Sequence, residues 1–195
     1  DQGKCRAVTT KAGEEIACGF VGLTVGVSPN VGFLKNTALE INRGILVNEH
    51  LETNQPDVYA IGDCAAHSNG FAEGAIIRLE SVQNANDQAK VAAQSITGSA
   101  QAYAATPWFW SNQYDLKLQT VGLSTGHDDV VMRGDPASRS FSLVYLRQGR
   151  VIALDCVNAV KDYVQGKALV VQGTQAKAAD LADTARPLKD LVAAA

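Results

Sequence analysis

The most constraining feature of the sequence is the run Pro-Asp-Val-Tyr-Ala-Ile-Gly-Asp at residues 56–63. It predicts a short apolar strand over residues 58–61 that ends at Gly62 and Asp63. Further along, Ser81 can cap the free amides of a helix and Gly98 can stop it. Small and apolar side chains at positions 82, 85, 89, 92, 93 and 96 are expected to form the buried face of this helix. The order strand, loop and helix predicts an α/β fold that binds a nucleotide.

The residue types at Gly62, at Asp63 and at the start of the predicted helix suit a bound flavin. The Asp63 carboxylate can accept hydrogen bonds from ribityl or ribose hydroxyls, and Gly62 has no side chain to keep a ligand from the backbone. The helix amides at Ser81 carry partial positive charge, which favours the N1 and O2 edge of a reduced flavin, with Glu80 and Val82 nearest the ring. Two simpler interpretations remain open: Asp63 caps a turn, and Ser81 caps an ordinary surface helix.

The sequence contains no Gly-x-Gly-x-x-Gly motif. That loop normally holds the pyrophosphate of a dinucleotide. We therefore expect that only part of a reductase is present.

Charge and cysteine content narrow the classes of partner. The net charge of -3 gives no basic field for nucleic acid, so no nucleic-acid partner is expected. The sequence has no long apolar run and no signal-peptide pattern, which predicts a cytoplasmic protein with no membrane partner. The four cysteines form no Cys-x-x-Cys pair and no zinc spacing with histidine. We expect reduced, mostly buried thiols and no metal site.

Two patterns follow one another along the chain. Residues 4–10 and 15–21 predict a hairpin, residues 20–27 a strand buried on both faces, residues 33–39 a short helix and residues 44–47 a strand. After Pro107 the pattern is antiparallel β, with strands at 116–120, 130–133, 140–146 and 150–157 and a helix at 158–171. The last residues, 172–195, predict a loosely held terminus with one short helix near Pro187.

The aromatic triplet Trp108-Phe109-Trp110 lies in an extended segment, where the two tryptophans share one face. Core packing is the favoured interpretation. The alternative is that one tryptophan lines the flavin pocket or a docking surface.

Six segments carry a family resemblance: Val-Gly-Val-Ser-Pro-Asn at 25–30, Gly-Ile-Leu-Val at 44–47, and the runs at 56–64, 78–85, 107–113 and 118–123. In this order they resemble the C-terminal half of FAD-dependent, NADH-using ferredoxin reductases of the putidaredoxin reductase and rhodocoxin reductase type. Pro-Trp-Phe-Trp-Ser is the most discriminating element. The resemblance covers nearly the whole chain.

The resemblance implies an α/β fold in which the end of a nucleotide-binding reductase domain is followed by a C-terminal α+β domain with an antiparallel sheet. Residues 1–26 would be the tail of the NAD-binding domain, 27–98 the returning segment of the FAD-binding domain, and 103–195 the C-terminal reductase domain. Asp63 would bind the FAD sugar chain, Val82 would contact the flavin ring through its backbone, and Glu80 and Trp110 would border the nicotinamide and flavin region. The full set of implied cofactor-binding residues is Gly62, Asp63, Glu80, Ser81, Val82, Trp110 and Asn30.

The implied function is that of an NAD(P)H-dependent flavoprotein oxidoreductase, incomplete in this chain. It would use FAD and NAD(H) and pass electrons from NADH through the flavin to a [2Fe-2S] ferredoxin serving a cytochrome P450 or an oxygenase. The alternative is a non-catalytic module that docks a partner protein and has a degenerate flavin site. Flavin content of the complete protein distinguishes the two.

Overall fold

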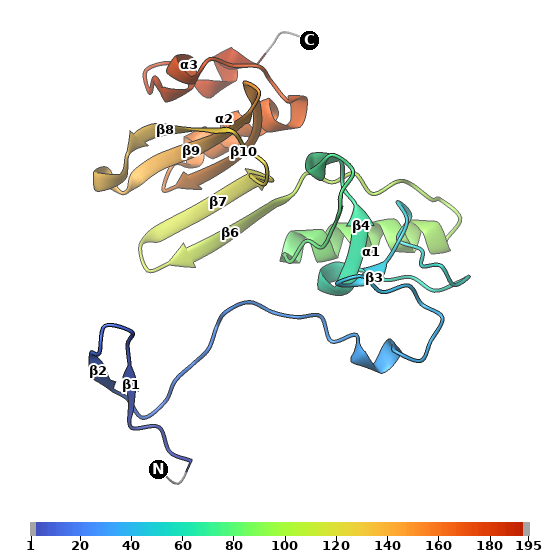
Figure 1. Ribbon diagram of the computed structural model, residues 1–195. Helices are drawn as coiled ribbons and strands as arrows, with labels where there is room; N and C mark the ends of the chain where they lie inside the picture. Colours follow the sequence, from blue (N-terminus) through green and yellow to red (C-terminus); the bar gives the residue numbers. More distant parts are fainter. Residues whose placement is uncertain (1–2, 193–195) are drawn as a thin grey trace.

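The computed structural model describes residues 3–192 and divides into three parts along the chain (Figure 1). The first is an antiparallel hairpin of β1 (Ala7–Thr9) and β2 (Glu15–Ala17). The second is a three-stranded sheet with the long helix α1 (Val82–Ile96). The third is a five-stranded antiparallel sheet with the remaining helices. This order confirms the predicted fold class, α/β elements followed by an α+β domain.

The second part is built around β4 (Ala65–Ser68). It pairs in parallel with β3 (Ile45–Leu46) and antiparallel with β5 (Ile76–Ile77). Three short 3-10 helices, Gly32–Leu34, Gly62–Cys64 and Gly70–Ala72, connect these elements. The predicted helix at 33–39 is therefore wrong beyond its first turn, whereas the predicted strand at 44–47 is confirmed at its centre.

The predicted strand at 58–61 is wrong. Tyr59 makes only an isolated bridge with Glu52, and the strand of this region, β4, follows Asp63 instead of preceding it. The reason is local: residues 51–60 fold back on themselves through the backbone hydrogen bonds Thr53 N to Val58 O (2.9 Å) and Ala60 N to Leu51 O (3.2 Å). Gly62 and Asp63 consequently lie in a turn that enters a strand.

The prediction of a buried strand at residues 20–27 is also wrong. Within residues 3–192 it pairs with no strand, and its large side chains face solvent: Phe20 is 84% exposed, Leu23 83% and Val25 91%. The sequence pattern is that of a strand with both faces covered, but the described residues contain no sheet beside it.

The third part has strand order β6-β7-β10-β9-β8, and every neighbouring pair is antiparallel. Its strands are β6 (Trp108–Gln113), β7 (Leu116–Gly122), β8 (Asp129–Asp135), β9 (Ser140–Arg147) and β10 (Arg150–Val157). Gln148 and Gly149 join β9 to β10 with positive φ values of 51° and 75°, which suits the right-handed twist of a hairpin. The four strands predicted after Pro107 are confirmed as β7, β8, β9 and β10.

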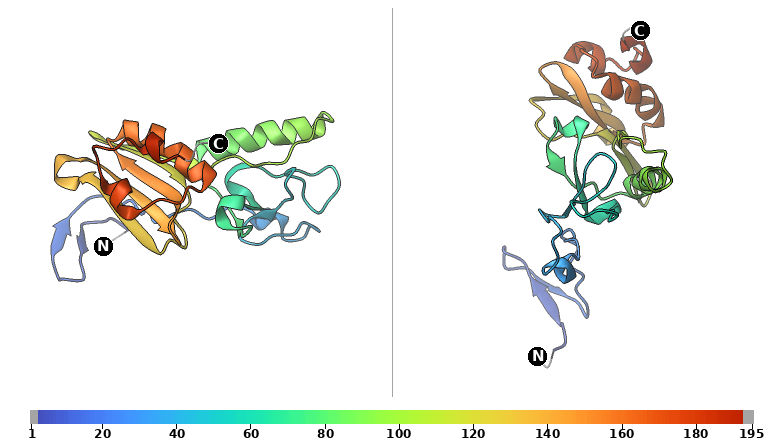
Figure 2. Two further views of the ribbon diagram at one scale, coloured as in Figure 1. Left: turned by 90° about the horizontal axis from the view of Figure 1, so that it is seen from above. Right: turned by 90° about the vertical axis from the view of Figure 1, so that its right-hand side faces the viewer.

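Helix α2 (Val160–Gln172) covers one face of this sheet and confirms the predicted helix (Figure 2). Val144, Val151, Leu154 and Leu169 are among the side chains buried between them. The chain continues through α3 (Ala178–Ala182) and a 3-10 helix at Leu188–Leu191, which begins after Pro187 as predicted. Among residues 3–192, no helix packs along the other face of the sheet.

The expected loose terminus is wrong for the residues that the structure describes. Leu181 and Leu188 are fully buried in the core of the third part. Arg133, only 4% exposed, pairs with Asp162 (3.1 Å) and donates to the backbone oxygens of Leu181 (3.1 Å) and Arg186 (2.9 Å). One buried guanidinium therefore fastens the C-terminal segment to β8. The last three residues lie outside the described part of the chain.

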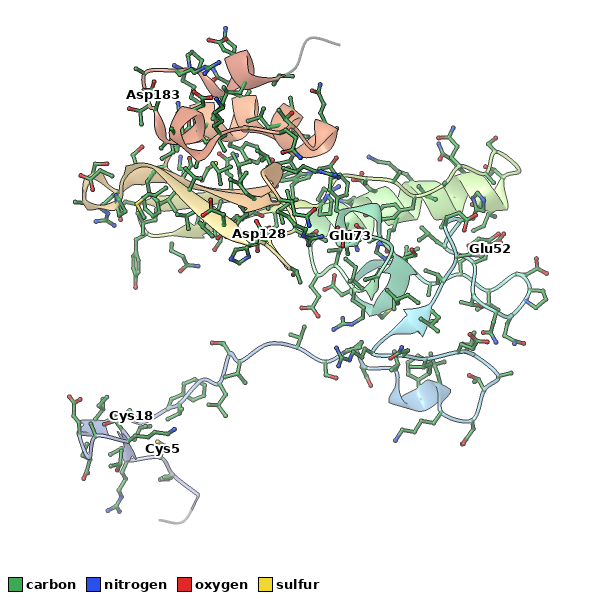
Figure 3. All side chains as sticks on the ribbon, turned by 45° about the horizontal axis from the view of Figure 1, so that its top comes forward. Cys5, Cys18, Glu52, Glu73, Asp128 and Asp183 are labelled. Atoms are coloured by element: carbon green, nitrogen blue, oxygen red, sulfur yellow. The ribbon has the colours of Figure 1, made fainter. Side chains whose placement is uncertain are left out.

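All four cysteines are free thiols, but only Cys156 is buried, so the expectation of mostly buried thiols is wrong. Cys5 and Cys18 lie side by side on the first hairpin (Figure 3). Among residues 3–192 no helix is both long and apolar enough to cross a bilayer, and no three metal-binding side chains are grouped together.

Candidate functional site

The turn at Gly62 and Asp63 packs against the first half of α1. Gly62 is buried with φ of 72°, a conformation that favours glycine, and its backbone N–H donates to Gln88 Oε1 at 2.7 Å. A Cβ at Gly62 would lie 3.6 Å from the Cβ of Ala85. Asp63 itself is exposed. The structure thus fixes the backbone of the turn to the helix and leaves the Asp63 carboxylate open to a ligand.

Gln88 belongs to a buried polar network that the sequence analysis missed. Its Nε2 lies 3.4 Å from Nδ1 of His67, and Asn69 Nδ2 lies 3.3 Å from the other ring nitrogen. Burial lowers the pKa of His67, which favours the neutral form of the ring. One turn earlier on α1, Asn84 accepts from the Tyr103 hydroxyl (2.7 Å) and donates to Leu79 O (2.9 Å).

This network corrects the predicted buried face of α1. The buried side chains are Asn84, Gln88 and Ala92, whereas Val82 is 64% and Ile96 66% exposed. Of the predicted face only Ala92 is buried, because hydrogen-bonded polar side chains can occupy the buried side of a helix as well as apolar ones. The four-residue spacing of Asn84 and Gln88 was the signal for a polar stripe.

Arg78 connects two of the predicted site residues. Its guanidinium donates to the backbone oxygen of Asp63 and pairs with the Glu80 carboxylate at 2.7 Å. Gly44 provides the space, because a Cβ there would lie 2.5 Å from Cδ of Arg78 and 2.7 Å from the Cys64 carbonyl oxygen. Arg78 therefore fixes the position of Glu80 relative to the turn at Asp63.

Ser81 caps α1 as predicted: its side chain accepts from the backbone N–H of Asn84 at 3.1 Å. Among the described residues, the amides of Val82 and Gln83 in the first turn have no backbone acceptor within the helix, as at every helix start. These amides and the exposed Val82 side chain lie beside Glu80 in the chain. The helix therefore presents partial positive charge next to an apolar surface.

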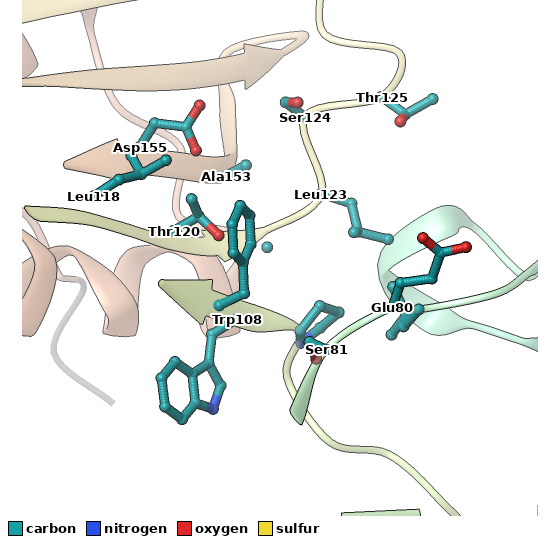
Figure 4. A pocket seen from close by; sticks show the side chains of 14 residues that line it. Glu80, Ser81, Trp108, Leu118, Thr120, Leu123, Ser124, Thr125, Ala153 and Asp155 are labelled. Carbon is teal, nitrogen blue, oxygen red and sulfur yellow. The ribbon is translucent and has the colours of Figure 1, made fainter. Parts of the chain in front are cut away.

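Glu80 and Ser81 line a cavity of about 310 Å³ between the start of α1 and the open face of the large sheet (Figure 4). Phe109, Thr120 and Asp155 line it from the sheet. Figure 4 shows Glu80 and Asp155 toward opposite ends of this cavity. Asp63 is not among the lining residues.

Asp155 is held by Tyr145, whose hydroxyl donates to Asp155 Oδ2 at 2.7 Å. Burial, with this hydrogen bond and the carboxylate charge, raises the pKa of Tyr145 to about 12. Each carboxylate of the cavity thus has a fixed partner, Arg78 for Glu80 and Tyr145 for Asp155. Asp155 and Tyr145 were not predicted from the sequence, and their alternation on paired strands was the available signal.

Two predicted site residues, Trp110 and Asn30, do not line this cavity. Trp110 is 45% exposed, stacks at 5.6 Å (ring centroids) on Trp108, and faces Val160 of α2 in a different pocket. Phe109 takes the cavity side of β6 instead, because neighbouring residues of a strand face opposite ways. Trp108 packs against the core, as favoured for the triplet. Asn30 is exposed in the extended segment before Gly32–Leu34.

Comparisons with known proteins agree with this architecture. Residues 1–89 match the pyridine nucleotide-disulphide oxidoreductase family, and residues 108–192 match the family described as reductase C-terminal. The ferredoxin reductase subunit of 5,5'-dehydrodivanillate O-demethylase from a Sphingobium species is 56% identical over 100% of this chain and 47% of its own length.

Two solved structures are similar throughout. A ferredoxin reductase from Rhodopseudomonas palustris matches with a TM-score of 0.89 and 39% identity over 99% of this chain and 48% of that one. The reductase in a covalent putidaredoxin reductase–putidaredoxin complex matches with a TM-score of 0.88 and 35% identity over 96% and 45%.

The fold agrees with the two family matches, pyridine nucleotide-disulphide oxidoreductase over residues 1–89 and reductase C-terminal over residues 108–192. Over nearly its whole length the chain is homologous to ferredoxin reductases, among them putidaredoxin reductase and rhodocoxin reductase. It spans about half the length of the curated relatives that it matches.

Proposed function

We propose that this chain forms part of an FAD-dependent ferredoxin reductase that passes electrons from NADH to a [2Fe-2S] ferredoxin serving a cytochrome P450 or an oxygenase. One arrangement carries the proposal: the turn bearing the exposed Asp63 is fastened by Gln88 and Arg78 to the same helix start that carries Glu80 and Ser81. Relatives named as ferredoxin reductases support the electron acceptor.

The donor set fits a flavin nucleotide. A free carboxylate at Asp63 suits sugar hydroxyls, and open amides at a helix start suit the electron-rich edge of an isoalloxazine. Val82 adds an exposed apolar contact beside those amides. When bound, FAD would supply the conversion of a two-electron hydride donor into single electrons.

The residues of this chain would act by binding and orientation. Asp63 would hold the sugar chain, and the Val82 and Gln83 amides would stabilise negative charge by about 0.3 to 2 kcal/mol, the range of helix-end effects. Glu80, fixed by Arg78, would border the nicotinamide region. We place Phe109 beside it, because Phe109 and not Trp110 shares the Glu80 cavity.

We further infer that residues 1–26 end an NAD-binding domain, residues 27–98 complete an FAD-binding domain, and residues 103–195 form the C-terminal domain. The upstream half of the same reductase would cover the apolar side chains that now face solvent. These are concentrated at Phe20, Leu23, Val25, Val27 and Phe33, each at least 69% exposed. A cytoplasmic location stays a prediction from the sequence.

The test is Asp63→Ala in the complete protein, with flavin content measured by absorbance after gel filtration. We expect FAD loss, because the variant removes the acceptor of the sugar hydroxyls. Asp115→Ala is the matched control: that exposed carboxylate pairs with Arg139 in the C-terminal sheet, away from the turn. Unchanged flavin content in Asp63→Ala would favour the non-catalytic docking module.

A second measurement addresses the electron donor and acceptor. The complete protein should be yellow and should bleach anaerobically on addition of NADH, then regain colour when an oxidised [2Fe-2S] ferredoxin is added. A colourless protein, or a yellow one that does not respond to NADH, would contradict the proposal.

A further inference from the structure

Two thiols touch across the first hairpin. The Sγ atoms of Cys5 and Cys18 lie 3.6 Å apart, and both side chains are partly exposed. Cys5 precedes β1 and Cys18 follows β2, so the pair sits at the open end of the hairpin, away from its turn (Figure 3). Nothing in the ferredoxin reductase chemistry described above uses either residue.

The hairpin backbone holds the two thiols together. Ala7 pairs with Ala17, and the Cys18 N–H donates to Arg6 O at 2.9 Å, directly beside the pair. The turn is closed by the Thr10 N–H to Glu14 O (2.9 Å). A disulfide needs sulfur atoms about 2.0 Å apart, so the sulfurs must still approach by side-chain rotation, but the strands are already in register.

The other two cysteines differ from this pair. Cys156 is buried in the core, where burial raises the pKa of its thiol to about 11. Cys64 donates to the backbone oxygen of Ile61 at 3.4 Å. Among the described residues only Cys5 and Cys18 have a second thiol within contact distance.

We propose that Cys5 and Cys18 form a reversible disulfide when the protein meets a low-molecular-weight disulfide such as glutathione disulfide. The Cys5 thiolate attacks one sulfur of glutathione disulfide, which forms a mixed disulfide and releases one glutathione thiolate. The Cys18 thiolate then attacks the Cys5 sulfur, forms the Cys5–Cys18 bond and releases the second glutathione. The two protein thiols are oxidised, the glutathione disulfide is reduced to two glutathiones, and the two protein protons pass to those thiolates or to water.

The contact between the thiols explains the order of the two steps. The hydrogen bond with Cys5 is the largest cause of the raised pKa of Cys18, followed by burial and the charge of Cys5. Cys18 is therefore the less available thiolate at first. Once Cys5 carries glutathione, its thiol hydrogen bond is gone and Cys18 is released for the second attack.

The test uses the complete reductase incubated with excess glutathione disulfide, then with N-ethylmaleimide, followed by intact-mass measurement and peptide mapping. We expect the native protein to lose two maleimide labels, at Cys5 and Cys18, with a mass lower by two hydrogens and no retained glutathione. Dithiothreitol should restore both labels. Cys5→Ser and Cys18→Ser should each stop at a glutathione adduct on the remaining thiol of the pair.

Cys64→Ser is the matched control, and it should form the Cys5–Cys18 disulfide as fully as the native protein. Persistent maleimide labelling of Cys5 and Cys18 would overturn the proposal, and so would separate glutathione adducts on both thiols in the native protein. The readout is a covalent bond and not a redox activity. Failure here would therefore leave the proposed flavin chemistry untouched, and absence of flavin would leave this result interpretable.

Discussion

The two large regions of this chain differ in how they are held together. Residues 107–192, the C-terminal unit, enclose an apolar core between one sheet face and α2, with Val121, Val151 and Leu154 fully buried. Residues 3–98, the N-terminal region, expose most of their large apolar side chains. Their best-buried side chains around α1 are polar, namely Asn84, Gln88 and His67.

This difference shows which apolar faces find a partner surface within the described residues. An apolar pattern becomes a buried face only when a partner surface exists, and in the C-terminal unit both partners lie within residues 107–192. In the N-terminal region the hydrogen-bond network fixes the turn at Asp63, while the apolar faces stay open. The two regions touch where Phe71 packs on the C-terminal core and Glu73 pairs with Arg147.

The largest effect is expected for Arg133→Met, which removes the buried cation of the C-terminal unit. The substitution removes the donor to Asp162 Oδ1 and to four backbone carbonyl oxygens, so the free energy of unfolding should fall by about 3 to 5 kcal/mol. Urea denaturation followed by tryptophan fluorescence measures it, because both tryptophans of this chain lie in β6.

Arg139→Met is the control for Arg133→Met. Arg139 pairs with Asp115 at 2.7 Å, but both side chains are more than half exposed, and such a pair contributes about 0 to 1 kcal/mol. Equal losses in the two variants would show that burial of the guanidinium does not matter.

A second contrast compares two leucines. Leu154→Ala should lower the free energy of unfolding by about 2 to 5 kcal/mol, because it leaves a cavity in a closed core. Leu23→Ala should change the stability of this chain by less than about 0.5 kcal/mol, because the side chain is exposed here. In the complete protein Leu23→Ala should become destabilising, if the upstream half covers it. An unchanged small effect there would argue against that cover.

Arg78→Met tests the link that Arg78 forms between the turn at Asp63 and Glu80 in the N-terminal region. The loss of its bonds to Asp63 O and Glu80 should weaken FAD binding to the complete protein about tenfold, which corresponds to about 1.4 kcal/mol. Fluorescence titration of the apoprotein with FAD measures the affinity. Lys90→Met, which removes an exposed pair with Asp87 on the same helix, should bind FAD normally.

The sequence predicted the C-terminal unit better than the N-terminal region. The strands and turn of the C-terminal sheet, and α2, were predictable because their alternation and turn residues express local rules that the unit itself satisfies. The strand at 20–27 was not, because the described residues contain no sheet beside it, and the buried face of α1 was not, because the polar side chains Asn84 and Gln88 occupy most of it. The strand at 58–61 failed because backbone hydrogen bonds of residues 51–60 close a local loop.

In the candidate site, Arg78 connects the turn at Gly62 and Asp63 with Glu80, next to Ser81 in the chain, and flavin binding by these residues stays a prediction. The supporting residues, Gln88 and the Asp155–Tyr145 pair, were missed. Their roles depend on contacts between segments 10 or more positions apart, which spacing alone does not reveal. Trp110 lies beside Val160 of α2 and Phe109 lines the Glu80 cavity, an arrangement that the sequence did not reveal because the position of α2 relative to β6 was unknown.

The smallest expected effect is a change in how stability depends on pH. Its measurement tests whether the two regions unfold together. Tyr103, which lies between α1 and β6, and Tyr145 in the large sheet both have pKa values raised to about 12, mainly by burial. A phenol whose folded pKa exceeds its unfolded value of about 10 stabilises the fold fully below pH of about 10, and loses that contribution as pH rises to about 12. Tyr145→Phe should therefore flatten the decline of tryptophan-detected stability across this window.

Tyr114→Phe is the control for Tyr145→Phe, because Tyr114 is fully exposed and should leave the profile unchanged. Tyr103→Phe gives the informative comparison. Its hydroxyl bonds to Asn84 in the N-terminal region, whereas the tryptophans report on the C-terminal unit. We expect little change in the tryptophan-detected profile, because the C-terminal unit has its own closed core. A flattening as large as that of Tyr145→Phe would mean that the two regions unfold as one cooperative unit.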